Sequence, residues 1–159
     1  INADPKVMQF YPNTLDKAAS NKMVLRIQQQ YKDYGFSVYA VDLLASKQFI
    51  GYIGFMRPSF ESYFTPCVEI GWRLAAKHWG KGYATEAANA ALKFAFSELD
   101  IVQVVSFTSI INTPSQQVTR TPGMCHAGNF THPDVSKDSP LAEHVLFKIS
   151  QDEWPRLNA

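Results

Sequence analysis

Apolar positions between residues 15 and 31 recur at a loosely helical spacing, which predicts a helix over this range. Thr14 or Asp16 can cap its N-terminus, because a short polar side chain there accepts hydrogen bonds from first-turn amides. Gly35 closes the region, as glycine commonly does at the end of a helix.

Three apolar runs with strand character follow this helix. Residues 36–41 and 49–56 are separated by a short polar turn, so they predict two antiparallel strands. Gly51 and Gly54 in the second strand indicate a bulge or a place where another backbone comes close. After a polar loop, residues 67–74 predict a third strand.

The apolar pattern then changes to a helical period. Between residues 84 and 99, alanines and larger apolar residues recur at three- and four-residue spacing, which predicts a helix with one buried face. Residues 101–111 are almost continuously apolar or β-branched. This is typical of a strand that is buried on both faces and pairs in parallel beside a helix.

The last part of the chain predicts a short helix and one more strand. The helix starts at Asn112 and is stopped by Pro122-Gly123, because proline cannot continue a helix. Residues 124–140 are loop-rich, and residues 143–149 predict the final strand. This order of elements predicts a single mixed α/β domain over residues 1–159, without repeats or linkers.

Composition fits one folded domain and narrows its partners. Hydrophobic residues make up 46% of the 159 positions, which is enough for a core. A formal net charge of +1 argues against a dedicated nucleic-acid or membrane-surface binder. With no membrane-length apolar stretch and no export signal, we expect a cytoplasmic protein in which Cys67 and Cys125 are reduced. The scattered histidines lack metal-ligand spacing, so we expect no metal.

The turn before the helix at 84–99 carries the chemical signal. A strand ends, Gly80 and Gly82 form a turn around Lys81, and a helix begins. First-turn amides have no intrahelical partner and the helix dipole adds partial positive charge, so such a turn binds phosphate. The glycines leave room for the phosphate, and the lysine adds a positive charge. Taken alone, the two glycines also fit an ordinary strand-to-helix turn.

Two other phosphate-binding motifs do not fit this turn. The Walker motif ends in Gly-Lys-Ser/Thr, whereas Gly82 and Tyr83 follow Lys81 here. The dinucleotide-binding motif needs a third glycine and an acidic residue after the following strand, and the sequence has neither.

Two blocks in the right order give the chain a wider resemblance. Trp79-Gly80-Lys81-Gly82-Tyr83-Ala84 fits a Gln/Arg-x-x-Gly-x-Gly/Ala pattern with Trp in its first position, and Asn112-Thr113-Pro114-Ser115 with Gly123-Met124 fits a second block. Across residues 1–150 the chain resembles the GNAT superfamily of acetyl-CoA-dependent N-acetyltransferases, in particular the branch with the ribosomal-protein alanine N-acetyltransferases. The resemblance implies a single α/β (α+β) domain whose mixed, mostly antiparallel sheet is V-split and flanked by helices.

The resemblance also implies how acetyl-CoA, the co-substrate, would bind. In the family, two parallel strands splay apart and the pantetheine arm lies in the gap. Carried onto this sequence, the backbone of Trp72, Arg73 and Leu74 would face that arm, with Asn112 and Ser115 near it. The pyrophosphate would be wrapped by the residues of the turn, namely Trp79, Gly80, Lys81, Gly82, Tyr83, Ala84 and Thr85.

For catalysis, the resemblance implies direct attack of an amine on the thioester, assisted by a base, an oxyanion donor and an acid. Many members have a tyrosine acid where this chain has Thr119, so Ser115 is the candidate acid, and Asn112 belongs to the same catalytic set. Glu69 is the candidate base, through water, because a carboxylate in an apolar strand favours a raised pKa. Ser115 could instead be a plain polar residue of a helical turn, and Glu69 a solvent-facing strand residue.

The acceptor and two rival functions stay open. The expected pocket loops, residues 12–35 and 57–66, carry no charge cluster that selects a protein N-terminus, a polyamine, an amino acid or an aminoglycoside. Glu61 with Glu69 is weak support for a cationic acceptor. We expect Pro122 to end the last helix a turn early, and its effect on the acceptor pocket stays open. A degenerate acyl-CoA-binding module without turnover and a nucleotide-phosphate binder are the rivals.

The family's first strand should precede Ile1, where this sequence begins abruptly. Without that strand, residues 36–41 would form an exposed sheet edge. We therefore expect either that upstream residues are missing from this sequence or that another chain, as in a homodimer, covers the edge.

Overall fold

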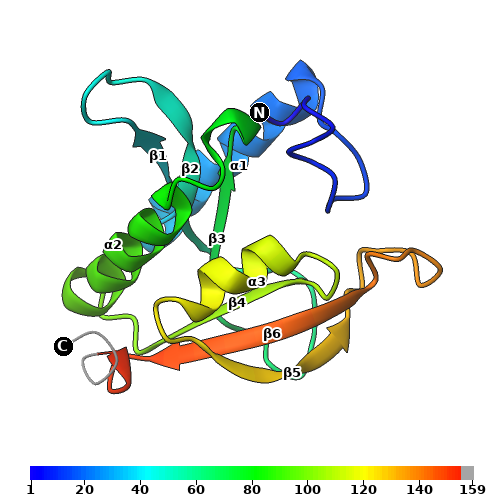
Figure 1. Ribbon diagram of the computed structural model, residues 1–159. Coiled ribbons are helices and arrows are strands. Elements are labelled where there is room, and N and C mark those ends of the chain that lie inside the picture. The colour runs from blue at the N-terminus through cyan, green and yellow to red at the C-terminus, as the bar shows by residue number, and fades with distance from the viewer. Residues whose placement is uncertain (155–159) are drawn as a thin grey trace.

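A computed structural model, which describes residues 1–154, shows one six-stranded sheet flanked by helices (Figure 1). The strand order is β1-β2-β3-β4-β6-β5, and every neighbouring pair is antiparallel except β3 and β4. The predicted fold class is confirmed. In chain order the elements are α1 (Lys17–Tyr34), β1 (Val38–Asp42), β2 (Phe49–Met56), β3 (Glu69–Leu74), η1 (Ala76–His78), α2 (Tyr83–Glu98), β4 (Gln103–Ser109), α3 (Thr113–Arg120), β5 (Cys125–Thr131) and β6 (Glu143–Ser150).

Local capping fixes both ends of α1. Of the two predicted caps, Asp16 is the one used, and its carboxylate accepts a hydrogen bond of 2.7 Å from the amide of Ala19. Gly35 ends the helix at φ 76°, in the left-handed conformation that glycine adopts without steric cost.

Both explanations offered for the β2 glycines hold. A Cβ on Gly51 would lie 2.7 Å from Leu74 Cα, and one on Gly54 would lie 2.6 Å from Val38 Cα, so neighbouring backbone leaves no room for a side chain. The register between β1 and β2 also shifts after Val41, as it does at a β-bulge.

The main core lies between α2 and one face of the sheet. The alanine-rich face predicted for this helix is confirmed, because its small side chains let α2 approach the strands closely. Buried residues of this core include Ala88, Leu92, Ala95 and Phe96 from α2, with Ile53, Phe55, Ile70, Val104, Phe147 and Ile149 from the strands.

Two predictions for the C-terminal third were wrong. The segment predicted as loop contains β5, an edge strand that pairs only with β6 and is mostly exposed, so it carries no apolar pattern. The strand predicted over residues 101–111 is shorter, because a turn follows Ser109. Ile110 and Ile111 lie in that turn, 43% and 47% exposed.

Among residues 1–154, β1 forms the opposite edge of the sheet and pairs with β2 alone. Cys67 and Cys125 are free thiols, as expected. Across the described range, no helix combines the length and apolarity needed to cross a bilayer.

Candidate active site

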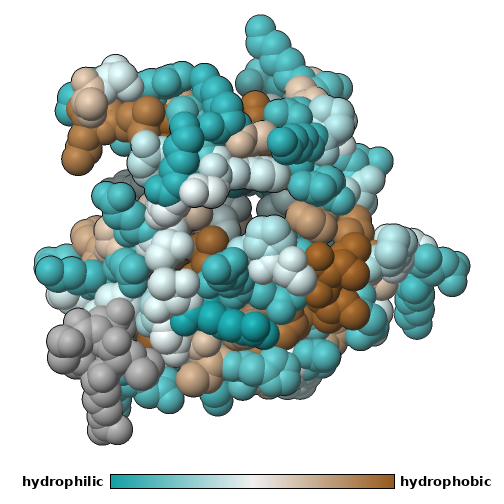
Figure 2. Space-filling model, viewed as in Figure 1, coloured by the Kyte–Doolittle hydropathy of each residue, from teal (hydrophilic) through white to brown (hydrophobic). Residues whose placement is uncertain are grey.

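The parallel strands β3 and β4 pair only at Glu69 and Val105 and then splay apart, as Figure 1 shows. In contrast, β3 pairs with β2 along its whole length. The edge of β3 beyond Glu69 therefore faces a gap and not a strand, and its backbone groups are open to a ligand. The gap belongs to a cleft of about 970 Å³, and the space-filling view is hollowed at this place, above α3 (Figure 2).

The glycine turn lies at one end of this cleft. Gly80 and Gly82 have φ of 71° and 81°, and a Cβ on either would meet no atom within 4 Å. Gly82 is the N-cap of α2 and supplies no side chain to cap it, whereas Asp16 and Asn112 cap α1 and α3. The first-turn amides of α2 are thus left for an external acceptor.

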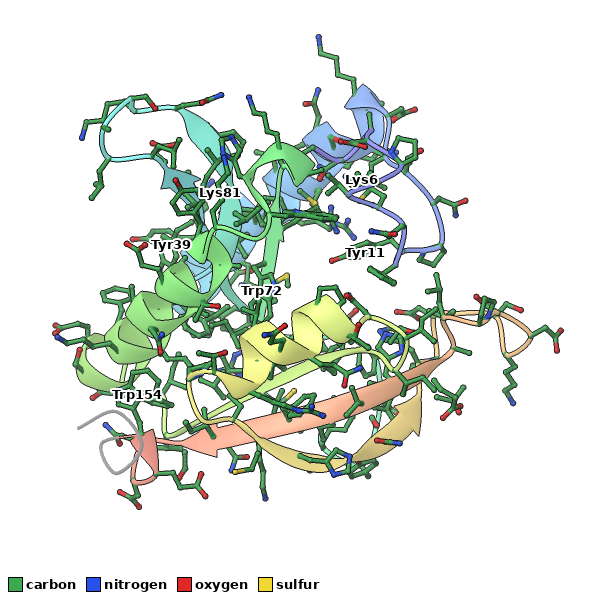
Figure 3. The ribbon with its side chains drawn as sticks, viewed as in Figure 1. Lys6, Tyr11, Tyr39, Trp72, Lys81 and Trp154 are labelled. Atoms are coloured by element: carbon green, nitrogen blue, oxygen red, sulfur yellow. The ribbon has the colours of Figure 1, made fainter. Side chains whose placement is uncertain are left out.

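The turn is tied back to the end of β3. Trp79 Nε1 donates a hydrogen bond of 2.9 Å to the carbonyl of Leu74, so that carbonyl already has a partner. Trp72 both lines the cleft and packs against the core beneath α2. Lys81 is exposed at the turn and, unlike the other candidate residues, does not line the cleft (Figure 3).

The remaining candidates predicted from the sequence all meet in this cleft. They come from β3, the turn, the first residues of α2 and the start of α3, which are far apart in the chain. Its lining includes Glu69, Trp72, Arg73, Leu74, Trp79, Gly80, Gly82, Tyr83, Ala84, Thr85, Asn112 and Ser115.

Glu69 lies where the two strands begin to separate, at the closed end of the gap. It is half-buried and lines the cleft. Burial raises the pKa of its carboxyl from 4.5 to about 8, because the charged form loses water. The group is therefore mostly protonated at pH 7 and becomes a base just above it.

The start of α3 places a hydroxyl beside the gap. Asn112 Oδ1 accepts a hydrogen bond of 3.3 Å from the amide of Ser115, and its Nδ2 donates one of 2.9 Å to Thr108 Oγ1. Both side-chain groups of Asn112 are thereby engaged within the protein. Thr119 is 1% exposed and its hydroxyl donates to the Ser115 carbonyl, so it cannot replace a tyrosine acid.

Sequence reasoning missed several residues that line the cleft. Tyr11 comes from the N-terminal segment, Arg26 from α1, Tyr52 from β2, and Arg57 follows β2. No spacing links these positions, since they lie on separate elements, so no sequence motif could have found them. Glu61, considered for an acidic pocket, does not line the cleft.

Comparison with known proteins establishes the family. Residues 1–125 match the family model for the acetyltransferase (GNAT) domain. The chain therefore belongs to the GNAT acetyltransferase family, and the resemblance inferred from its two sequence blocks is confirmed. The protein is an N-acetyltransferase by class.

Several known proteins have similar sequences, and two of them illustrate the degree of identity and coverage. An uncharacterized protein of Bacillus subtilis (strain 168), YkkB, is 32% identical over 121 residues, which are 76% of this chain and 69% of that protein. The FsC-acetyl coenzyme A-N(2)-transacetylase of Aspergillus fumigatus is 33% identical over 98 residues, 61% of this chain. The match spans only 42% of the Aspergillus protein.

Solved structures share the fold over almost the whole chain. A GNAT-family acetyltransferase from Bacillus anthracis has a TM-score of 0.76 and 25% identity, covering 96% of this chain and 86% of its own. The spermidine N-acetyltransferase of Vibrio cholerae, in complex with CoA and spermine, has a TM-score of 0.75 at 17% identity, covering 97% and 88%. A ribosomal-protein-S5-alanine acetyltransferase from Vibrio fischeri has a TM-score of 0.72 at 15% identity, covering 92% and 81%.

Proposed function

We propose that this protein transfers the acetyl group of acetyl-CoA to a primary amine by direct attack of the amine on the thioester. The observation that carries the proposal is the gap between β3 and β4, which opens in front of the uncapped first turn of α2. A narrow gap with open strand backbone suits an extended pantetheine arm. A helix N-terminus without a cap suits the diphosphate.

The cofactor is held mainly by backbone groups. Amides between Trp79 and Thr85 bind the diphosphate, while the backbone groups of Trp72, on the free edge of β3, bind the pantetheine arm. The backbone groups of Arg73 face β2 instead, because these groups alternate along a strand and Val68 faces β4. Because the Leu74 carbonyl accepts from Trp79, Leu74 acts through its remaining backbone group and through packing. Lys81 contributes charge from outside the cleft.

In this pose the thioester lies at the closed end of the gap, next to Glu69. The carboxylate removes a proton from the acceptor ammonium through water, and the free amine forms a bond to the carbonyl carbon. When the carbon–sulfur bond breaks, the leaving thiolate takes a proton from the Ser115 hydroxyl, and the serine oxygen regains one from the attacking nitrogen, which thereby becomes the neutral amide. Asn112 is a positioning residue, since its hydrogen bond to the Ser115 amide fixes the first turn of α3.

Replacing Ser115 with alanine should lower kcat by about tenfold, because the thiolate would leave without its proton donor. Coenzyme A affinity should stay within about twofold, since the cofactor is held elsewhere by backbone amides. Release of free thiol gives kcat, and calorimetric titration gives the affinity. Ser97→Ala on the exposed side of α2 is the matched control, and equal kcat in both variants would exclude Ser115 as the acid.

Incubation with acetyl-CoA and a panel of primary amines tests the function itself. We expect free thiol to be released with at least one amine class, together with a mass gain of one acetyl group on that amine. Thermal stabilisation by acetyl-CoA without thiol release from any amine would favour a binding module without turnover. Equal stabilisation by ATP and coenzyme A would favour a general nucleotide-phosphate binder.

A further inference from the structure

The charged residues that line the cleft are mainly cationic. Arg26, Arg57 and Arg73 line it, whereas its carboxylates are Glu69 and Asp134. Glu69 adds little negative charge near pH 7 because burial raises its pKa to about 8. An excess of cations on a concave wall attracts anions and repels polyamines.

Arg73 is the cation built most firmly into this wall. Its Nη1 donates a hydrogen bond of 2.8 Å to Asn2 Oδ1, and its Cζ lies 4.2 Å from the Tyr11 ring centroid and 5.5 Å from that of Tyr52. The two tyrosines hold the guanidinium in place through cation–π contacts. No carboxylate of the described residues forms an ion pair with it, and its buried Nε has no hydrogen-bond partner.

An arginine in this setting is unusual for a purely structural residue. Its Nη1 has an uncharged acceptor in Asn2, but leaving the buried Nε donor without an acceptor costs free energy, and proteins normally supply a carboxylate to a guanidinium. A guanidinium presents planar pairs of N–H donors that match the oxygens of a carboxylate or phosphate. These donors therefore indicate an oxyanion as the partner of Arg73.

Arg73 points away from the core face of β3. Side chains alternate along a strand, so Arg73 shares a face of β3 with Glu69, opposite Trp72 and the core. Arg73 therefore lines the cleft from the face of β3 that carries Glu69.

We propose that the acceptor amine carries a second, anionic group, a carboxylate or a phosphate, and that Arg73 binds this group. The inference rests on the proposed function, since the amine itself would lie at Glu69. Four residues along a strand span roughly 13 Å, so the amine and the anion stand at opposite ends of a short chain and not on one carbon. Arg26 and Arg57 add long-range attraction.

Matched acceptors test this site. The probes are 6-aminohexanoate, its neutral carboxamide, an aminoalkyl phosphate of similar length, and spermidine, each assayed by thiol release from acetyl-CoA. We expect kcat/KM for at least one of the two anionic probes to exceed that of the carboxamide by about tenfold or more, with spermidine the poorest acceptor. Whichever anion is preferred distinguishes carboxylate from phosphate.

Substitution at Arg73 shows whether this residue is the one that discriminates between anionic and neutral acceptors. Arg73→Gln should reduce the ratio of kcat/KM between anionic and neutral probe to about one, and Arg73→Lys should keep part of it, because charge remains while the planar donors are lost. The ratio is independent of the fraction of folded enzyme, so partial misfolding does not distort it. Lys93→Gln, which removes a charge on α2 outside the cleft, should leave the ratio unchanged.

Calorimetric titration of the coenzyme A complex with the same probes separates this inference from the proposed function. If no amine releases thiol, the function fails, but a binding ratio that depends on Arg73 still supports the anion site. A wild-type ratio near one, a preference for spermidine, or a ratio unchanged in Arg73→Gln would each overturn the inference even if the enzyme acetylates amines.

Discussion

Replacing Gly82 with aspartate should weaken coenzyme A binding by about 100-fold or more, equivalent to ~2.7 kcal/mol. Gly82 adopts φ 81° at the N-cap of α2, a conformation that aspartate tolerates better than other charged residues. The new carboxylate would enter the open space in front of the first-turn amides and would repel the diphosphate there. Calorimetric titration with coenzyme A measures the loss.

Gly35 provides a matched control for the cost of the substitution. It has φ 76° and ψ 0°, close to the φ 81° and ψ −8° of Gly82, and a Cβ on either would meet nothing within 4 Å. Gly35→Asp at the end of α1 should therefore show similar backbone strain with unchanged coenzyme A affinity. If the two variants bind coenzyme A equally well, the turn is not the diphosphate site. Gly82→Asn separates the effect of shape from that of charge.

Glu69→Gln should lower kcat/KM by about 10²- to 10³-fold, because the amide cannot accept the proton of the ammonium. Since burial raises the carboxyl pKa to about 8, the carboxylate forms as pH rises through that value, and wild-type activity should rise with it. The activity of the variant should not show this rise, which forms one limb of the pH–rate profile of the wild type. Glu61→Gln, which alters an exposed carboxylate outside the cleft, should keep both the rate and the limb.

The same pKa shift gives a stability readout. A carboxyl whose pKa is 4.5 when unfolded and about 8 when folded binds its proton more tightly in the folded state. Its contribution to the free energy of unfolding is complete below about pH 4.5 and is lost as pH rises towards 8. The Tm of wild type should therefore fall relative to Glu69→Gln between pH 5 and pH 9. A constant Tm difference, or a pH–rate limb that survives in the variant, would contradict Glu69 as the base.

Much of the fold could be predicted from the sequence because its signals are local. The spacing of Ala88, Leu92 and Ala95 requires a helix with one face against the sheet, and α2 shows it. Asp16 caps the N-terminus of α1 and Gly35 closes its C-terminus, each through contacts within one or two turns of the helix. The glycine turn is equally local, since its function depends on the backbone of consecutive residues.

The elements that the sequence did not predict depend on distant partners. β5 has mostly exposed side chains and is a strand only because β6 provides hydrogen bonds to its backbone. Ile110 and Ile111 continue the apolar pattern of β4, yet the chain turns there, and Asn112 donates its amide to the Ser109 carbonyl at 2.9 Å. Apolar character alone could not reveal that turn.

For the site, the sequence by itself determined the glycine turn, the carboxyl group at Glu69 and the hydroxyl group at Ser115 as candidates, and the family to which the chain belongs. The resemblance implied splayed strands and the apolar strand favoured a raised pKa, but only the tertiary structure decided that β3 separates from β4 just beyond Glu69, and that burial there raises the pKa of this carboxyl to about 8. It also brought Arg26, Arg57 and Arg73 to one cleft. Backbone amides act through neighbours in the chain, whereas desolvation and the summed field of charges depend on residues that only folding brings together.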